Sequence, residues 1–400
     1  MSAVSFLIVR DRGGLAQVVV SDELGREQLD GLNEETVVSV DGTVTPNAKA
    51  PGGFELTNPH ITKLSSPAAT PPVELWRPSL STSLPTLLDH APVLWRHRTQ
   101  QAIWRLAAAS LRGFRRVLDD QGFTEIHTPK IVASSTESGA NVFSVDYFGR
   151  PAYLAQSPQF YKQIMVGAFE RVYETGPVFR AEPHDAVRHL AEYVSLDAEL
   201  GFITDHRDVL SVLRDVVAAM VAEIRCIAAD DAELAQAHLP DVPDEIPIVH
   251  FRDALQLVGA DPDEPDLAPE HERRLGQWAR EEFGSDFLAV EGYPAKKRPF
   301  YTHPQPDDPY WTISFDLLFR GLEIVTGGQR LHEYADYELA LADRGETTEP
   351  YESYLQTFRH GMPPHGGFAL GLERWTARLI EVDNIRRTTL FPRDLHRLTP

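Results

Sequence analysis

The chain has 400 residues, of which 42% are hydrophobic and 24% are charged, so it can bury a core large enough for about two domains. Its formal net charge of −21 argues against a generally basic nucleic-acid binder, although it does not exclude a local basic surface. The single cysteine, Cys226, excludes an intrachain disulfide framework, and no apolar run approaches the ~20 residues of a membrane span. These features predict a cytoplasmic protein.

The first 75 residues predict a small β-barrel or sandwich. The runs 6–9, 17–20 and 37–40 are apolar or β-branched and are separated by turns, and residues 54–57 can begin a further strand. Short strands at this density are typical of such folds. Serines and prolines follow, so we expect residues 76–92 to form a linker.

From residue 93 the pattern predicts a second domain that extends to residue 400. Apolar residues recur at helical spacing between residues 93 and 120, which indicates an amphipathic helix packed on a core. Predicted strands at 171–179, 312–319 and 368–370 do not alternate strictly with predicted helices at 208–226 and 373–380. The expected fold class is therefore α+β, with an antiparallel or mixed sheet rather than a doubly wound one.

The acidic residues are concentrated in one segment of this domain. Residues 230–286 contain 16 Asp and Glu against 4 Lys and Arg, a net charge of −12, so the rest of the chain carries only −9 of the total −21. We interpret this segment as an insertion and expect it to lie away from the residues that carry chemistry.

An arginine-rich segment is the strongest candidate for a phosphate site. A predicted strand delivers Arg180, a polar loop follows, and Arg188 and His189 precede the next strand. The planar guanidinium group donates two parallel hydrogen bonds, which suits phosphate. On residue types alone, a hairpin with surface ion pairs explains the same pattern equally well.

Two further patterns suit a nucleotide. Asp316, Glu323 and Thr326 provide hard oxygen ligands of the kind that Mg²⁺ prefers, although a strand with charged edges is the alternative. Glycines at 366, 367 and 371 allow close backbone approach before a helix whose first turn contains Arg374. A cation at a helix start is unfavourable unless a polyphosphate or a ring lies opposite it.

The segment Gln156-Ser157-Pro158-Gln159-x2-Lys162 can bind a small polar ligand. Its amide and hydroxyl groups supply hydrogen bonds, and Lys162, one of only six lysines, supplies a point charge for a carboxylate. A loop and helix start with a solvated lysine is the alternative.

Taken together and in their order along the chain, these segments resemble the sequence motifs of the class II aminoacyl-tRNA synthetases. Phe179-Arg180-Ala181-Glu182 with Arg188-His189-Leu190 resembles motif 2, Gly371-Leu372-Glu373-Arg374 resembles motif 3, and Gly122-Phe123 with Thr128-Pro129 resembles motif 1. The segments 156–162, 323–330 and 361–367 resemble the archaeal-type aspartyl enzymes in particular. The β-rich start, residues 1–75, resembles their anticodon-binding OB barrel; the family's first strand would precede Phe6, and we expect it to be missing here, so that the barrel is truncated.

The resemblance implies a reaction and a set of site residues. L-aspartate and ATP would give aspartyl adenylate, and the aspartyl group would pass to tRNA-Asp, with tRNA-Asn as a second candidate acceptor. Arg180 and Arg374 are the implied catalytic residues. The implied ATP-binding residues are Arg180, Ala181, Glu182, Arg188, His189, Leu190, Tyr193, Glu323, Gly371, Leu372, Glu373 and Arg374. The implied aspartate-binding residues are Glu137, Ser157, Gln159, Lys162, Arg180, Asp197, Thr326 and Arg330. The implied Mg²⁺ ligands are Glu323, Thr326 and Asp316.

The resemblance also implies a homodimer, and it favours aspartate over asparagine because of Lys162. Two other functions remain open at this point. A paralogue could keep the adenylate chemistry and serve a non-tRNA acceptor, as an aspartate–ammonia ligase or a tailoring or resistance copy does. A non-enzymatic tRNA-binding role is the weaker alternative, because no expected site residue is missing from the sequence.

Overall fold

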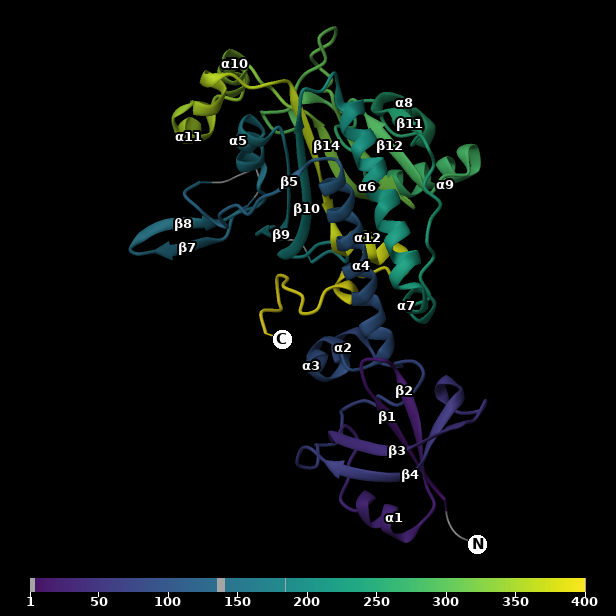
Figure 1. The fold of residues 1–400 in the computed structure, drawn as a ribbon. Coiled ribbons are helices and arrows are strands. Elements are labelled where there is room, and N and C mark those ends of the chain that lie inside the picture. The colour runs from purple at the N-terminus through teal and green to yellow at the C-terminus, as the bar shows by residue number, and fades with distance from the viewer. Residues whose placement is uncertain (1–3, 135–140, 184, 400) are drawn as a thin grey trace. The chain divides into compact units, whose positions relative to one another are not determined.

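The computed structural model describes residues 4–134, 141–183 and 185–399, which form two compact units, Met1–Ser81 and Thr82–Pro400 (Figure 1). The boundary falls inside residues 76–92, for which the sequence predicts a linker. The second half of that segment is largely helical, with α2 (Leu84–Asp89) followed closely by α3 (Ala91–Leu94).

The small unit contains a four-stranded sheet in the order β1-β2-β4-β3. Its strands are β1 (Ser5–Arg10), β2 (Leu15–Val20), β3 (Val38–Pro46) and β4 (Phe54–Lys63). Val18, Val20 and Ile61 form the buried centre of its apolar cluster. One helix, α1 (Glu23–Leu29), is not predicted by apolar periodicity, and it begins where the Asp22 carboxylate accepts a hydrogen bond from the Gly25 amide.

The large unit is built on an eight-stranded sheet in the order β11-β12-β13-β14-β15-β10-β9-β5. All neighbouring pairs are antiparallel except β11–β12 and β5–β9. This mixed, mainly antiparallel sheet confirms the predicted α+β class. The strands are β5 (Thr124–Glu125), β9 (Arg171–Phe179), β10 (Glu192–Gly201), β11 (Ile248–His250), β12 (Phe287–Glu291), β13 (Ser314–Phe319), β14 (Leu322–Gln329) and β15 (His365–Gly371).

Three helices, α4 (Arg98–Asp120), α6 (His206–Ile227) and α12 (Leu372–Leu379), cover one side of this sheet (Figure 1). Their apolar stripes share one core cluster with the inward residues of β10, β13, β14 and β15. A Cβ atom on Gly113 would lie 2.7 Å from the Cα of Met220, so the absence of a side chain lets α4 and α6 cross closely. The candidate site residues of the sheet project from its other side.

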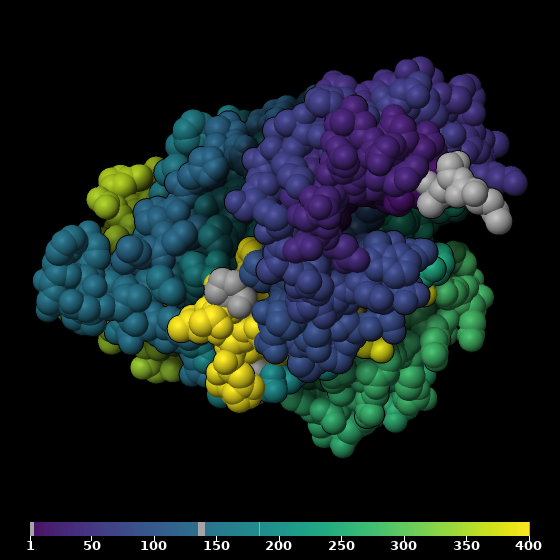
Figure 2. All heavy atoms as spheres, turned by 90° about the horizontal axis from the view of Figure 1, so that it is seen from below, coloured from purple at the N-terminus to yellow at the C-terminus, as the bar shows by residue number. Residues whose placement is uncertain are grey.

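The remaining elements surround the sheet. A three-stranded sheet has the order β6-β8-β7, and its β7–β8 hairpin protrudes from the large unit (Figures 1 and 2). Phe148, in the turn of this hairpin, is 89% exposed. No helix in the described part of the chain is both long and apolar enough to cross a lipid bilayer. These elements are β6 (Ile131–Val132), β7 (Ser144–Tyr147), β8 (Arg150–Leu154), α5 (Gln159–Phe169), α7 (Ala229–Leu234), α8 (Phe251–Val258), α9 (Pro269–Phe283), α10 (Tyr334–Asp343) and α11 (Glu352–Leu355).

Candidate active site

A row of site residues crosses four strands of the large sheet. Asp197 on β10 is opposite Ala369 on β15, Ala369 is opposite Thr326 on β14, and Thr326 is opposite Asp316 on β13. Residues that are directly opposite in an antiparallel pair project from the same side. The register therefore places three predicted site residues in one line, on the side of the sheet opposite the helical core.

One end of this site is a buried cluster of four charged side chains. Lys162 comes from α5, and its Nζ donates to Asp197 Oδ1 at 2.9 Å and lies 3.3 Å from Glu199 Oε2. Arg330 follows β14, and its Nε donates to Glu199 Oε1 at 2.9 Å. All four residues are at most 5% exposed. Each of the two buried cations therefore has a buried carboxylate partner, which offsets the cost of removing both charges from water.

Glu199 is the residue of this cluster that sequence reasoning missed. Burial alone would raise the pKa of Glu199, but the adjacent Arg330 and Lys162 lower it, so Glu199 is a carboxylate that holds both cations. A signal was available, because Glu199 is two residues after Asp197 and so projects from the same side of β10. A Cβ atom on Gly367 would lie 2.0 Å from Glu199 Oε2, so the glycine leaves the space that this carboxylate fills.

A second buried network holds α5 in place. The Gln163 amide donates to His365 Nε2 at 2.9 Å, while its carbonyl accepts from Gln159 Nε2 at 2.9 Å and from Tyr354 Oη at 3.0 Å. His365 Nδ1 lies 2.9 Å from the Pro363 carbonyl, which can only accept, so Nδ1 bears the proton. Burial lowers the pKa of His365 to about 4, which keeps the ring neutral. These bonds orient the helix from which Lys162 reaches the site.

The other end of the site contains the predicted carboxylate pair. Asp316 Oδ2 accepts from Arg298 at 2.8 Å, while its buried Oδ1 has no hydrogen-bond partner among the described residues. Burial raises the pKa of Asp316 to about 6; Arg298 opposes this rise, and the negative charge of Glu323 adds to it. Thr326 Oγ1 donates to Glu323 Oε1 at 3.4 Å. Asp316 is thus the member of the pair whose charge is disfavoured by burial, although no group of three or more His, Cys, Asp or Glu in the described ranges could hold a metal.

Four arginines converge on Glu323. Burial would raise its pKa, but Arg374, Arg298, Arg188 and Arg180 lower it. Arg374 Nη1 donates to the Glu323 carbonyl oxygen at 2.9 Å. The predicted phosphate-binding arginines of the loop after β9 and of α12 therefore lie around one end of β14. Arg298 is an addition that no sequence pattern indicated.

The prediction that the acidic segment 230–286 lies away from these residues is wrong. Its helix α9 brings Glu272 into contact with two of them. Glu272 Oε1 accepts from Arg188 Nη1 at 2.8 Å, and Oε2 accepts from the backbone amide of Glu323 at 2.8 Å. Burial raises the pKa of Glu272, while the hydrogen bond from Arg188 lowers it.

The other predicted site residues occupy less direct positions. The Arg180 guanidinium lies 5.7 Å from the centroid of the Tyr193 ring. The side chain of Glu373 is turned away from the arginines, since both of its oxygens accept from the Val194 amide, and that of Leu372 packs in the core. Glu137 lies outside the described residues. Ser157, Gln159 and Leu190 are buried, while Ala181, Glu182, His189 and Gly371 are partly exposed.

Glu373 leads to a prediction about stability. Burial raises its pKa from 4.5 to about 7, despite the hydrogen bond from Val194. Between these values the unfolded chain ionises more readily than the folded one, so the wild type loses stability as the pH rises, and the loss is complete above pH 7. Glu373→Gln stays neutral at every pH. We therefore expect the unfolding free energy of the variant, relative to that of wild type, to rise by roughly 3 kcal/mol between pH 4.5 and pH 8.

Urea unfolding of both proteins at the two pH values measures this difference. Glu338→Gln is the control, because Glu338 is exposed on α10. A difference between Glu373→Gln and wild type that does not change with pH would contradict the assignment.

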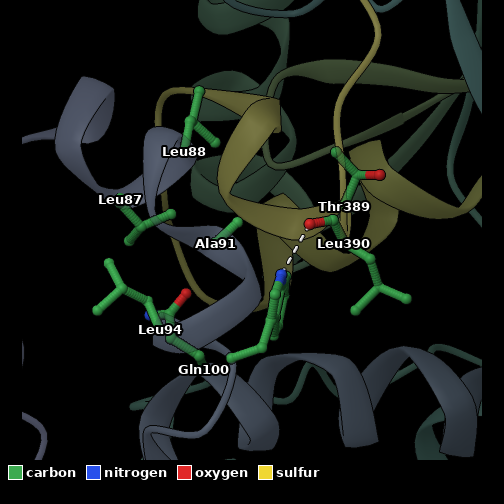
Figure 3. A pocket seen from close by; sticks show the side chains of 8 residues that line it. Leu87, Leu88, Ala91, Leu94, Gln100, Thr389 and Leu390 are labelled. Carbon is green, nitrogen blue, oxygen red and sulfur yellow. Dashed lines mark hydrogen bonds between the residues drawn. The ribbon is translucent and has the colours of Figure 1, made fainter. Parts of the chain in front are cut away.

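A separate apolar groove lies between α2, α3 and the segment near Leu390 (Figure 3). Trp95 Nε1 donates to the Leu390 carbonyl oxygen at 2.7 Å across it. Its lining has no charged side chain, so it contributes packing rather than chemistry. The lining residues are Leu87, Leu88, Ala91, Leu94, Trp95, Gln100, Thr389 and Leu390.

Two family models match this chain, one in each of its two units. The family model of tRNA synthetases class II (D, K and N) matches residues 84–395, and that of the OB-fold nucleic acid binding domain matches residues 1–64. The aspartate–tRNA(Asp/Asn) ligase of Thermus thermophilus is 45% identical over 406 residues, covering 100% of this chain and 94% of the relative. The aspartate–tRNA(Asp) ligase of Picrophilus torridus is 37% identical over 407 residues, with 100% and 94% covered.

A solved structure is also similar to this chain over nearly its whole length. The asparaginyl-tRNA synthetase from Pyrococcus horikoshii complexed with asparaginyl-adenylate matches with a TM-score of 0.90 and 31% identity, covering 99% of this chain and 92% of that chain. The fold is therefore common to relatives that are named for aspartate and for asparagine, so the fold alone does not select between these amino acids.

Proposed function

The chain belongs to the class II aminoacyl-tRNA synthetases of the aspartate, lysine and asparagine group, and we propose that it works as the aspartate–tRNA ligase of this group. It activates L-aspartate with ATP to form aspartyl adenylate and transfers the aspartyl group to tRNA-Asp. The observation that carries this function is the buried pair of cations, Lys162 and Arg330, at one end of the site.

Activation is an attack of the aspartate α-carboxylate on the α-phosphorus of ATP. A carboxylate–phosphorus bond forms, the bond to the β-phosphate oxygen breaks, and pyrophosphate leaves with the electron pair. Negative charge on both reactants opposes this step, so cations matter more than a general base. We assign Arg180 to the α-phosphate and the α-carboxylate, and Arg374 and Arg188 to the outer phosphates. Tyr193 would stack on the adenine, and Ala181, Glu182, His189, Leu190 and Gly371 would complete the nucleotide site, whereas Leu372 and Glu373 hold the start of α12 against the core and β10.

Aspartate is preferred to asparagine because recognition depends on charge. Lys162 and Arg330 would bind the side-chain carboxylate, and Asp197, Gln159 and Glu137 would receive the ammonium group. In the free site Lys162 is paired with Asp197; once Asp197 receives the ammonium group, a neutral amide could not replace that negative charge beside Lys162, and such a loss discriminates strongly. Ser157 and Thr326 would supply hydroxyl groups around the bound amino acid.

The residues at the other end of the site fit Mg²⁺. The buried Asp316 Oδ1, which lacks a hydrogen-bond partner in the described ranges, and the raised pKa of Asp316 both favour an added cation. Glu323, Thr326 and Asp316 would hold the ion, with ATP phosphates and water as its other ligands, as is usual for Mg²⁺. When bound, it would neutralise charge on the phosphates.

The small unit, which matches the OB-fold family, would bind the tRNA. Relatives named for tRNA(Asp/Asn) support tRNA-Asn as a second acceptor. We also infer a homodimer, because β5, in the segment that resembles motif 1, is an edge strand of the large sheet. A monomeric mass in light scattering would contradict the dimer.

Charging of purified tRNA tests the function. We expect the protein to acylate tRNA-Asp with aspartate in the presence of ATP and Mg²⁺, and tRNA-Asn in a parallel reaction reports the second acceptor. Absence of aspartate-dependent ATP–pyrophosphate exchange would overturn the proposal. Exchange without acylation of either tRNA would instead identify a paralogue that uses a non-tRNA acceptor.

A further inference from the structure

Glu272 joins three separate parts of the site through one buried carboxylate. Its two oxygens accept from different segments: Oε1 from the Arg188 guanidinium, which follows β9, and Oε2 from the backbone amide of Glu323, near the start of β14. Arg374 donates in turn to the carbonyl oxygen of Glu323. The Glu272 side chain is only 3% exposed, whereas the Arg188 side chain is 26% exposed and so remains accessible to a ligand.

The position of Glu272 is rigidly set by close packing of α9 on the turn between β13 and β14. A Cβ atom on Gly276 would lie 2.4 Å from the Gly321 backbone nitrogen, and one on Gly321 would lie 2.8 Å from the Arg273 Cα. Gly321 also has a φ of +70°, which favours glycine. Helix and turn therefore touch backbone to backbone, so Glu272 cannot move without moving the start of β14.

We propose that Glu272 is a positioning residue for ATP: it aligns the Arg188 guanidinium with the Glu323 end of β14, so that Arg188 is already directed toward the polyphosphate before ATP binds. An arginine with many rotamers pays an entropic penalty when a ligand orders it, and a buried carboxylate that fixes the guanidinium removes much of that penalty. Glu272 touches no substrate in this role and acts through Arg188.

The arginines around Glu323 explain why a buried carboxylate is needed behind Arg188. Arg188, Arg180, Arg374 and Arg298 all act on Glu323, so the site concentrates cations that repel one another when no ATP is bound. Without a buried anion behind it, Arg188 would turn toward solvent. Glu272 thus links the acidic segment to nucleotide binding, and this inference rests on the proposed function.

The test is the Glu272→Gln variant in aspartate-dependent ATP–pyrophosphate exchange. The amide keeps the volume but places an N–H group against one of the two donors, so one contact is lost. We expect KM for ATP to rise by about tenfold while KM for aspartate changes by less than about twofold. In an Arg188→Ala background, Glu272→Gln should have little further effect, because the residue acts through Arg188.

The controls separate this inference from simple structural damage and from the proposed function. Glu270→Gln, on the same helix with a 72% exposed side chain, should behave like wild type. Glu272→Asp keeps the charge but is too short to bridge both donors, and it should raise KM for ATP by a smaller factor. Equal rises in both KM values, or full additivity with Arg188→Ala, would overturn the positioning role. Lack of exchange in the wild type would instead overturn the function itself.

Discussion

Arg180→Ala is expected to lower aspartate-dependent ATP–pyrophosphate exchange by at least about a thousandfold. The reason is the position of Arg180 directly after β9, where its charge acts on Glu323 together with three other arginines. Arg374 and Arg188 are assigned to the outer phosphates in the proposed arrangement, and Arg298 is bound to Asp316. None of them can replace a group that must neutralise the α-phosphate and the aspartate carboxylate in the same step.

Initial rates of exchange at saturating ATP and aspartate measure this loss. Arg150→Ala is the control, because Arg150 is an exposed arginine on the protruding β7–β8 hairpin. It should retain wild-type rates and melting temperature. If Arg180→Ala retained more than about a tenth of the wild-type rate, its assignment to the α-phosphate would be wrong.

Lys162→Met should raise KM for aspartate by about a hundredfold or more and remove most of the preference for aspartate over asparagine. Methionine preserves the length and packing of the side chain but lacks the ammonium group, so the change is mainly electrostatic. Asp197 then loses its closest cation, and Glu199 keeps only Arg330. ATP binding should change little, because the arginines around Glu323 are untouched.

The same variant is expected to lose about 3–5 kcal/mol of unfolding free energy, because two buried carboxylates are left under-compensated. Equilibrium unfolding gives that value, and exchange kinetics with aspartate and with asparagine give the selectivity. Lys296→Met is the control, since Lys296 is exposed. A folded Lys162→Met protein with unchanged KM for aspartate would contradict the assignment of Lys162 to substrate recognition.

Local pattern predicted much of the fold. The strand predicted at 171–179 coincides with β9, and helix 208–226 lies within α6, because alternation and helical periodicity are properties of neighbouring residues. The helix predicted from residue 93 instead begins at Arg98. There the His97 side chain accepts a hydrogen bond from the Thr99 amide and caps a new helix after α3. Helix boundaries depend on such single contacts.

Site residues could be predicted where a short segment of the sequence combines residue types that suit one kind of ligand. Arg180, Lys162, Glu323 and Arg374 were all predicted in this way. Glu199, Arg298 and Glu272 were not, because each resembles an ordinary charged residue in its own segment. Their partners Arg330, Asp316 and Arg188 lie 131, 18 and 84 positions away in the chain.

The sequence by itself determined the fold class, the motif residues and the amino acid most suited to the site, since these depend on residue type and on short spacing. Only the tertiary structure decided which charges neutralise one another. The net charge illustrates the difference: the sequence predicts that the acidic segment 230–286 is a separate insertion, yet its helix α9 places Glu272 against Arg188. Sheet register and helix packing bring such distant segments together, and in a buried environment a single charge must find its partner wherever the chain provides one.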